Sequence, residues 1–406
     1  SSVSSSSAAA AATTSTVAVP PASPRAGAPS ARVLAFAMAA ASTVSAAAAA
    51  AAAAAPHAAH AAAAADPASV YHPAPTVPVI PSTASPDEVL VGRIVKQKLE
   101  SVETSDGDGA RVRRSIGTRA LPRLDPFLML DEFSIAPPAG FPPHPHRGQS
   151  TVTYMVSGRV EHEDFKGHRG IIGPGDLQWM TAGRGIVHSE MPKSESRTGL
   201  QLWVNLPREH KMVAPDYQEL LAKDVPRVRL GGATATVIAG TAFGVESPVR
   251  TKYTPTNYLV FTLDPGAVLT QAIPAGWNAF VYVLEGSGSF GGSLSKPAAA
   301  AAVAADGTAA AAAAGVHTGG TRSPAHHTLV LSNSGKEDGV VISAGDAGVT
   351  FALISGRPTK EPVVQHGPFV MTTHEEIAAA FEDYSRDRNG FEGASAFSAD
   401  WDARHY

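Results

Sequence analysis

The sequence predicts an all-β protein built from two barrels in tandem, on the basis of two observations. From residue 86 onward, short runs rich in β-branched and aromatic residues alternate with Gly, Pro and Asp, as in residues 151–156 before Ser157-Gly158. Short strands separated by such turn residues are typical of a β-sandwich or barrel. A similar run at residues 277–284 also ends in a Gly turn. It looks like a second copy of the first run, so we expect a second barrel.

The predicted organisation has a tail, two barrels and one insertion. Residues 1–85 are rich in Ala, Ser, Thr and Pro and almost free of charge, so they cannot bury a core and are expected to be disordered. The first barrel is predicted over residues 86–230 and the second over residues 231–406. An Ala- and Gly-rich tract at about residues 295–323 is interpreted as a disordered insertion within the second barrel.

A short helix is predicted near the C-terminus, over residues 373–384. The segment begins with Thr373, and Glu375 and Glu376 lie in its first turn. A hydroxyl residue followed by acids is typical of a helix N-terminus. We therefore expect this helix to cap the barrels.

The N-terminal tail is interpreted as a targeting segment. It is hydroxyl-rich and weakly basic, which is typical of organelle transit peptides, and its scarcity of Arg favours the chloroplast over the mitochondrion. The cytoplasm and the nucleus are the remaining alternatives. Residues 33–55 carry no charge and are long enough to span a bilayer, but Ala contributes little insertion energy. An export segment or a membrane anchor is therefore the less favoured interpretation.

Composition limits the chemistry that the protein can perform. Its 32 basic and 36 acidic side chains give a net charge of −4, so direct nucleic-acid binding is not expected. The absence of cysteine excludes disulfides, iron–sulfur clusters and thiolate-bound metals. A metal would therefore be held by imidazole and carboxylate groups.

Two pairs of polar residues share the same spacing. His144 and His146 are separated by one residue, as are His188 and Glu190. Residues i and i+2 of an extended segment face the same side, and the prolines around His144 favour an extended backbone. If the two pairs lie on neighbouring strands, all four side chains converge inside the barrel. The sequence therefore predicts one mononuclear metal site made by His144, His146, His188 and Glu190.

The ligand set indicates which metals are suitable. Three neutral imidazoles and one carboxylate leave a divalent ion with a charge near +1 and, in octahedral geometry, two open positions. This suits Fe(II), Mn, Ni or Cu binding O₂ or a bidentate oxygen ligand better than a closed zinc site. Fe(II) is the expected metal. Nearby polar groups, at residues 162–164 and His168, are expected in a hairpin loop and are not chosen as ligands.

Several motifs closely resemble those of the pirin family. Those around the four residues are HPHRG at 144–148, HEDF at 162–165, PGDLQWMTAGRGIVHSEMP at 174–192 and GLQLWVNLP at 199–207. The resemblance extends upstream to GARVRRSIG at 109–117 and downstream to QHGPFVM at 365–371. It covers nearly everything after residue 88, and the tail and the Ala-rich insertion fall outside it. With the targeting segment, it suggests an organelle-targeted member from a plant or alga.

The resemblance to pirins implies a bicupin fold, in which two double-stranded β-helix barrels of jelly-roll type follow each other. It implies a mononuclear iron in the N-terminal cupin, held by three His and one Glu that fall on His144, His146, His188 and Glu190. It also implies a C-terminal cupin without metal. The histidines of the second barrel are therefore interpreted as structural: His326, His327 and His366.

The resemblance to pirins implies two alternative functions. The first is a quercetin 2,3-dioxygenase activity, in which a flavonol's oxygens chelate the iron, O₂ cleaves the heterocycle and Glu190 acts as ligand and proton acceptor. The alternative is a non-enzymatic redox sensor or transcriptional or signalling co-regulator that binds a protein partner. The enzyme is favoured. A purely structural cupin is disfavoured because it has no need of four intact ligands.

Access to the metal would separate the two functions. An enzyme needs a mouth for a flat aromatic substrate, and five side chains are candidates for its lining, although Trp179, like Trp203, is better interpreted as core. A regulator would instead present a charged patch beside the metal. The candidate mouth residues are Phe141, Met155, Phe165, Trp179 and Met180, and the candidate patch residues are Arg147, Lys166, Arg169 and Arg184.

Overall fold

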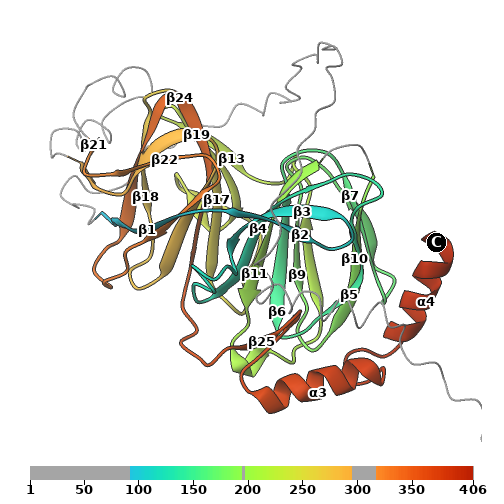
Figure 1. Ribbon diagram of the computed structural model, residues 1–406. Coiled ribbons are helices and arrows are strands. Elements are labelled where there is room, and N and C mark those ends of the chain that lie inside the picture. The colour runs from blue at the N-terminus through green and yellow to red at the C-terminus, as the bar shows by residue number, and fades with distance from the viewer. Residues whose placement is uncertain (1–91, 194–196, 295–316, 406) are drawn as a thin grey trace, which may run out of the picture.

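The computed structural model describes residues 92–193, 197–294 and 317–405. They form two β-barrels side by side, followed by two C-terminal helices (Figure 1). The predicted all-β fold of two tandem barrels is confirmed. The predicted targeting segment lies outside the described residues. No helix in the described part of the chain is long and apolar enough to cross a membrane.

The N-terminal barrel is made of two antiparallel sheets. The first has seven strands in the order β12-β9-β6-β11-β4-β3-β2, and the second has four strands in the order β5-β10-β7-β8. The short 3₁₀ helix Arg208–His210 follows β11. The strands are β2 (Val102–Asp106), β3 (Ala110–Ile116), β4 (Phe127–Ile135), β5 (Phe141–His146), β6 (Gln149–Met155), β7 (Val160–Asp164), β8 (Arg169–Ile172), β9 (Leu177–Thr181), β10 (Ile186–Pro192), β11 (Arg197–Asn205) and β12 (Asp216–Leu220).

The C-terminal barrel is built on one nine-stranded sheet. Its main path is β1-β23-β19-β24-β17-β14-β13, with β18 paired to β24 and β22 paired to β19. Three small two-stranded sheets are β15-β16, β20-β21 and β25-β26. The strands are β1 (Val95–Glu100), β13 (Arg227–Leu230), β14 (Ala233–Ala239), β15 (Thr241–Ala242), β16 (Val245–Glu246), β17 (Thr256–Leu263), β18 (Val268–Ala272), β19 (Asn278–Phe290), β20 (Ser293–Leu294), β21 (His317–Thr318), β22 (Thr321–Pro324), β23 (His327–Leu331), β24 (Gly339–Gly356), β25 (Val364–His366) and β26 (Phe369–Met371).

Two segments differ from the expected loops. Residues 317–318 and 321–324, expected within the disordered insertion, form β21 and β22, while residues 295–316 lie outside the described residues. Residues 162–164, expected in a hairpin loop, belong to strand β7. Burial alternates along β7, with Val160, His162 and Asp164 buried and the two residues between them partly exposed. His162 and Asp164 therefore lie on the buried face of the strand.

The two barrels exchange their terminal elements. Strand β1 precedes the first barrel in the chain but pairs with β23 of the second. At the other end, β26 bridges to the first barrel, where Val370 N donates to Arg147 O at 3.0 Å. Helix α3 (His374–Ser385) follows and lies beneath the first barrel, and α4 (Ala394–His405) lies beside it (Figure 1). The C-terminus therefore covers the first barrel.

Helix α3 begins as its sequence predicts. Thr373 is the N-cap, its hydroxyl accepts from Glu376 N at 3.2 Å, and the Glu376 carboxylate accepts from Thr373 N at 3.1 Å. This reciprocal capping box satisfies donors that the first helical turn leaves free. The predicted C-terminal helix is confirmed. Helix α4, which sequence reasoning did not predict, follows it.

One apolar cluster joins the two barrels. It contains Phe127 and Val152 from the first barrel together with Tyr258, Phe280 and Ile354 from the second, all at most 1% exposed. The rings of Phe127 and Phe280 meet edge to face, with centroids 5.3 Å apart. Because buried apolar area stabilises at roughly 25 cal/mol per Å², this continuous core holds the barrels together.

Candidate metal centre

The His144/His146 pair and the His188/Glu190 pair lie on adjacent strands, as expected. Strand β5 carries the first pair and β10 carries the second, and the antiparallel register places His188 opposite His144. The register shifts between His188 and Glu190, so that Glu190 pairs with Phe141. The two pairs therefore meet inside the N-terminal barrel.

The prolines of β5 are compatible with its position in the sheet. Pro142, Pro143 and Pro145 lack a backbone N–H, which excludes them from the middle of a sheet. Strand β5 is the edge strand of the four-stranded sheet, so it needs partners on one side only. The edge position lets the sequence use prolines to hold His144 and His146 in an extended backbone.

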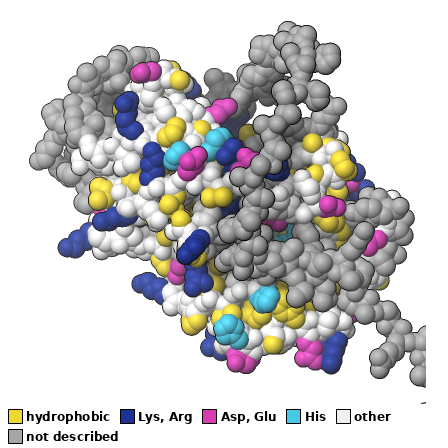
Figure 2. Space-filling model, in the orientation of Figure 1, with side chains coloured by type: hydrophobic (Ala, Val, Ile, Leu, Met, Phe, Trp, Pro, Cys, Tyr) yellow, Lys and Arg dark blue, Asp and Glu magenta, His cyan; other side chains and the backbone are white. Residues whose placement is uncertain are grey.

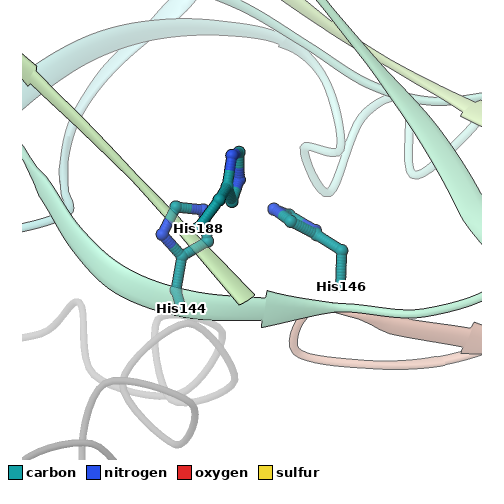
Figure 3. A group of neighbouring side chains, drawn as sticks. All are labelled: His144, His146 and His188. Atoms are coloured by element: carbon teal, nitrogen blue, oxygen red, sulfur yellow. The ribbon is translucent and has the colours of Figure 1, made fainter. Parts of the chain in front are cut away.

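Three imidazoles converge at this point (Figure 3). The ring centroids of His144, His146 and His188 are 4.5 to 5.1 Å apart, and one ring nitrogen from each lies within 4.8 Å of the others. The three side chains are 8%, 2% and 2% exposed. The cluster is therefore a buried, nitrogen-lined site of the size that a single metal ion requires.

The donor set fits a metal ion. Burial lowers the pKa of all three histidines, and well below 6.5 for His146 and His188, which favours the neutral imidazole that a metal ion requires as a ligand. Neither nitrogen of His188 has a hydrogen-bond partner within the described residues. A buried polar atom without a partner is costly, and a metal would satisfy it.

Hydrogen bonds to the other histidines select the nitrogen that faces the cluster. His144 Nδ1 lies 2.8 Å from Pro142 O, which makes Nδ1 the protonated nitrogen and leaves Nε2 as the donor to a metal. Gln149 Nε2 lies 3.0 Å from His146 Nδ1, and Gln149 Oε1 has no hydrogen-bond partner among the residues that the structure describes. Turning the Gln149 amide by 180° would let Oε1 accept from Nδ1–H and free Nε2 of His146 in the same way.

Glu190 lies outside the group of ligand atoms within 4.8 Å. Its carboxylate is buried, and its two oxygens accept from Thr153 Oγ1 at 3.0 Å and from Gln201 Nε2 at 3.1 Å. Burial raises the pKa of Glu190, and these two hydrogen bonds and the nearby His162 oppose that effect. The role of Glu190 as fourth ligand therefore stays a prediction.

The spacing rule did not identify the residues that orient the site. Gln149, Thr153 and Gln201 lie on β6 and β11, in the seven-stranded sheet opposite the ligands. Gln149 follows His146 by three residues, but nothing in the local sequence marks Thr153 or Gln201. Only the closure of the barrel brings them to Glu190.

The predicted charged patch needs a correction at Arg147. Lys166, Arg169 and Arg184 are exposed as expected, but Arg147 is 1% exposed. Its guanidinium donates to Asp383 of α3 at 2.9 Å and to the backbone of Arg184 and Asn389. The C-terminal segment covers this side chain, which the sequence does not reveal.

Acidic and basic side chains are interspersed over the face seen in Figure 2.

Most of the candidate mouth residues belong to the core. Met155, Trp179 and Met180 are buried in apolar clusters, which agrees with the core interpretation of Trp179. Phe141 and Phe165 are partly buried. Trp203, which was also interpreted as core, is partly buried, and its ring meets that of His146 edge to face at 5.1 Å.

The second-barrel histidines have structural surroundings. His326 Nδ1 lies 2.9 Å from Glu132 Oε2, and His327 Nδ1 lies 2.9 Å from Ala325 O. The His366 ring packs edge to face on Phe381, with centroids 5.1 Å apart. Within the described residues, none of the three belongs to a group that could hold a metal ion.

Comparison with known proteins gives one consistent family. The family model described as Pirin matches residues 109–204, and the one described as Pirin C-terminal cupin domain matches residues 258–390. A pirin-like protein from Solanum lycopersicum is 50% identical over 302 residues, which cover 74% of this chain and 94% of that protein. Pirin from Mus musculus is 48% identical over 302 residues, with the same coverage.

This chain is also similar to the solved structure of an enzyme. The crystal structure of a quercetin 2,3-dioxygenase from Acinetobacter baumannii matches with a TM-score of 0.61 and 30% identity, covering 73% of this chain and 97% of that chain. The first family model includes β5 and β10, the strands that carry the three histidines, and the second covers most of the C-terminal barrel. This chain therefore belongs to the pirin family, and its two barrels are cupins.

Proposed function

We propose that this protein is an iron-dependent dioxygenase that opens the heterocycle of a flavonol such as quercetin with O₂. The observation that carries the proposal is the convergence of three buried, neutral imidazoles, of which His188 has two unpartnered nitrogens. The likeness to a quercetin 2,3-dioxygenase at 30% identity supports the choice of reaction.

In this proposal His144, His146, His188 and Glu190 hold the metal. Iron held there would supply a Lewis acid for the flavonol's oxygens and a redox partner for O₂. The protein would contribute a rigid ligand set, because three ligands lie on paired strands and their neighbours orient them. The neutral state of the imidazoles would keep the site ready at physiological pH.

Glu190 is proposed to accept the proton of the flavonol hydroxyl. Its carboxylate is buried on the same strand as His188, and an ionised carboxylate held in place there can accept a proton from a bound hydroxyl. The hydrogen bonds from Thr153 and Gln201 would hold the carboxylate in place when it receives the proton. Removing them would therefore affect both metal affinity and proton transfer.

A second candidate is a non-enzymatic iron-dependent redox sensor that binds a protein partner. The observation in its favour is burial: the four candidate ligands are at most 8% exposed, and Met155, Trp179 and Met180 pack in the core. A sensor needs no substrate entrance. Arg147 would connect the metal centre to α3, since it follows His146 directly and pairs with Asp383.

The test is oxygen uptake by anaerobically iron-loaded protein when quercetin is added. We expect uptake that scales with bound iron in the wild type and falls to background in His144→Ala. His327→Ala is the control, because His327 Nδ1, like His144 Nδ1, lies 2.9 Å or less from a carbonyl two residues earlier, but His327 lies in the second barrel.

Two kinds of result would contradict the proposed enzyme. Uptake that is independent of iron, or equal in His144→Ala, would exclude the proposed active site. Bound iron that cycles between oxidation states without any oxygen uptake would favour the sensor.

A further inference from the structure

A second cluster of metal-ligating side chains lies where the two sheets of the N-terminal barrel meet. His162 is on β7, His168 is in the turn between β7 and β8, and Glu219 is on β12. One ligand atom from each lies within 4.8 Å of the others. Strands β8 and β12 are edge strands of different sheets, so the cluster spans the seam between them.

Two of the three separations within this cluster are those of neighbouring metal ligands. His162 Nε2 lies 2.9 Å from Glu219 Oε1, and His168 Nε2 lies 3.0 Å from the same oxygen. Two ligand atoms bound to one ion at about 2.0–2.2 Å lie roughly 2.8–3.6 Å apart at octahedral or tetrahedral angles. Small side-chain movements would therefore bring all three atoms onto one ion.

The buried member of the cluster has an unsatisfied nitrogen. His162 is 2% exposed, and its Nε2 has no hydrogen-bond partner in the part of the chain that the structure describes. It approaches Glu219 Oε1 closely without the alignment that an N–H···O bond requires. An unsatisfied buried nitrogen is costly, and coordination of a cation would use its lone pair.

Surrounding residues hold the three side chains in place. A Cβ at Gly170 would lie 2.5 Å from His162 Nε2, so a larger residue there would displace the ring. Gln178 Nε2 donates to Glu219 Oε1 at 2.7 Å, and the His168 ring packs on Tyr217 with centroids 4.2 Å apart. Such supporting contacts are typical of metal ligands, whose orientation depends on their neighbours.

We propose that His162, His168 and Glu219 bind a second divalent transition-metal ion of the Zn²⁺ class. Two imidazoles and a carboxylate are a suitable ligand set for such an ion. Because His168 and Glu219 are about one third exposed, water would complete the coordination. The ion would fasten β12 to β7 and β8 across the seam. This inference does not depend on the proposed dioxygenase activity.

The test is a calorimetric titration of metal-free full-length protein with Zn²⁺. We expect two equivalents in the wild type and one in the double variant His168→Ala/Glu219→Gln. One equivalent is also expected in His144→Ala/His188→Ala, which leaves the second cluster intact. The control His327→Ala should retain two. The variants of the second cluster replace partly exposed side chains, so the fold should survive, and circular dichroism checks this.

A second measurement locates the ion. In the His144→Ala/His188→Ala background, Zn²⁺ should raise the thermal unfolding midpoint, and adding His168→Ala and Glu219→Gln should abolish that shift or weaken binding at least about tenfold. A His144→Ala/His188→Ala variant that binds no Zn²⁺, or a His168→Ala/Glu219→Gln variant that binds as many equivalents as the wild type, would overturn the proposal. Neither result would bear on catalysis at the first site.

Discussion

At the residue scale, the metal centre depends on hydrogen bonds that fix the direction of each donor. His144 is oriented by a carbonyl two residues earlier, but Glu190 is oriented by Thr153 and Gln201, which lie on other strands. Neighbours of metal ligands commonly contribute about 10- to 100-fold to metal affinity. The contribution of Thr153 can therefore be measured directly.

Thr153→Val should weaken binding of the proposed iron by about 10- to 100-fold while the fold is retained, because valine keeps the shape and removes the hydroxyl that donates to Glu190. Competition with a chelator of known affinity measures the change. Thr151→Val is the matched control: Thr151 is equally buried on β6, and within the described residues its hydroxyl makes no hydrogen bond. Equal affinities in the two variants would argue against Glu190 as a ligand.

At the element scale, helix α3 is fastened to the first barrel by one buried ion pair. Arg147 and Asp383 have side chains that are only 2% and 8% exposed. Burial alone would raise the pKa of Asp383, but hydrogen bonds from Arg147, Asn389 and Arg388 lower it below 3.8. The carboxylate is therefore ionised at neutral pH and balances the buried guanidinium.

Asp383→Asn should destabilise the protein by on the order of 3 kcal/mol, because it leaves the Arg147 charge buried without its counter-ion. Chemical denaturation measures the loss. The adjacent Glu382→Gln is the control: in the part of the chain that the structure describes, Glu382 pairs with the exposed Arg386 and Arg388, and such exposed pairs are worth less than about 1 kcal/mol. A similar loss in both variants would show that the pair is not what holds α3.

The turn between β5 and β6 depends on Gly148. Its φ is +81°, and a Cβ there would lie 1.9 Å from Val370 O, in the C-terminal segment. Gly148→Ala should therefore combine a left-handed backbone cost of about 1–2 kcal/mol with an overpacking cost of about 1–3 kcal/mol. Gly167→Ala measures the backbone cost alone, because φ is +88° there and no atom lies within 4 Å of the added Cβ.

Denaturation curves of the two glycine variants separate these costs. Gly148→Ala is expected to be the less stable by at least about 1 kcal/mol, and to loosen the contact between β26 and the first barrel. Equal stabilities would mean that the C-terminal segment moves away without cost.

At the scale of the whole molecule, the barrels share one apolar cluster and exchange their ends. Strand β1 completes the sheet of the second barrel, and Phe369 and Phe391 pack against Val187 of the first. Each barrel therefore buries part of its apolar surface against the other barrel or against the C-terminal segment. We expect a single unfolding transition, observed at the same denaturant concentration by tryptophan fluorescence and far-ultraviolet circular dichroism.

The isolated segment 86–230 tests this coupling. It lacks Asp383, Phe391 and the second-barrel half of the shared cluster, so it should show no cooperative transition. Two resolved transitions in the full chain, or a segment as stable as the full chain, would contradict the coupling.

The sequence alone predicted what local geometry determines. Alternation with period two places His144 and His146 on one face of a strand, and His188 and Glu190 on one face of another. The acids after Thr373 predict the start of α3 because a capping box is satisfied within four residues. Turn residues between short β-rich runs predict the all-β class.

The tertiary structure decided everything that depends on contacts between distant segments. Arg147 and Asp383 are 236 residues apart, and His162 meets Glu219 only because β7 and β12 reach the same seam. Strand β1 joins the second barrel although the chain then enters the first. Local sequence encodes backbone direction and turn position, whereas barrel closure and register depend on burial of the whole apolar surface, which no short segment specifies.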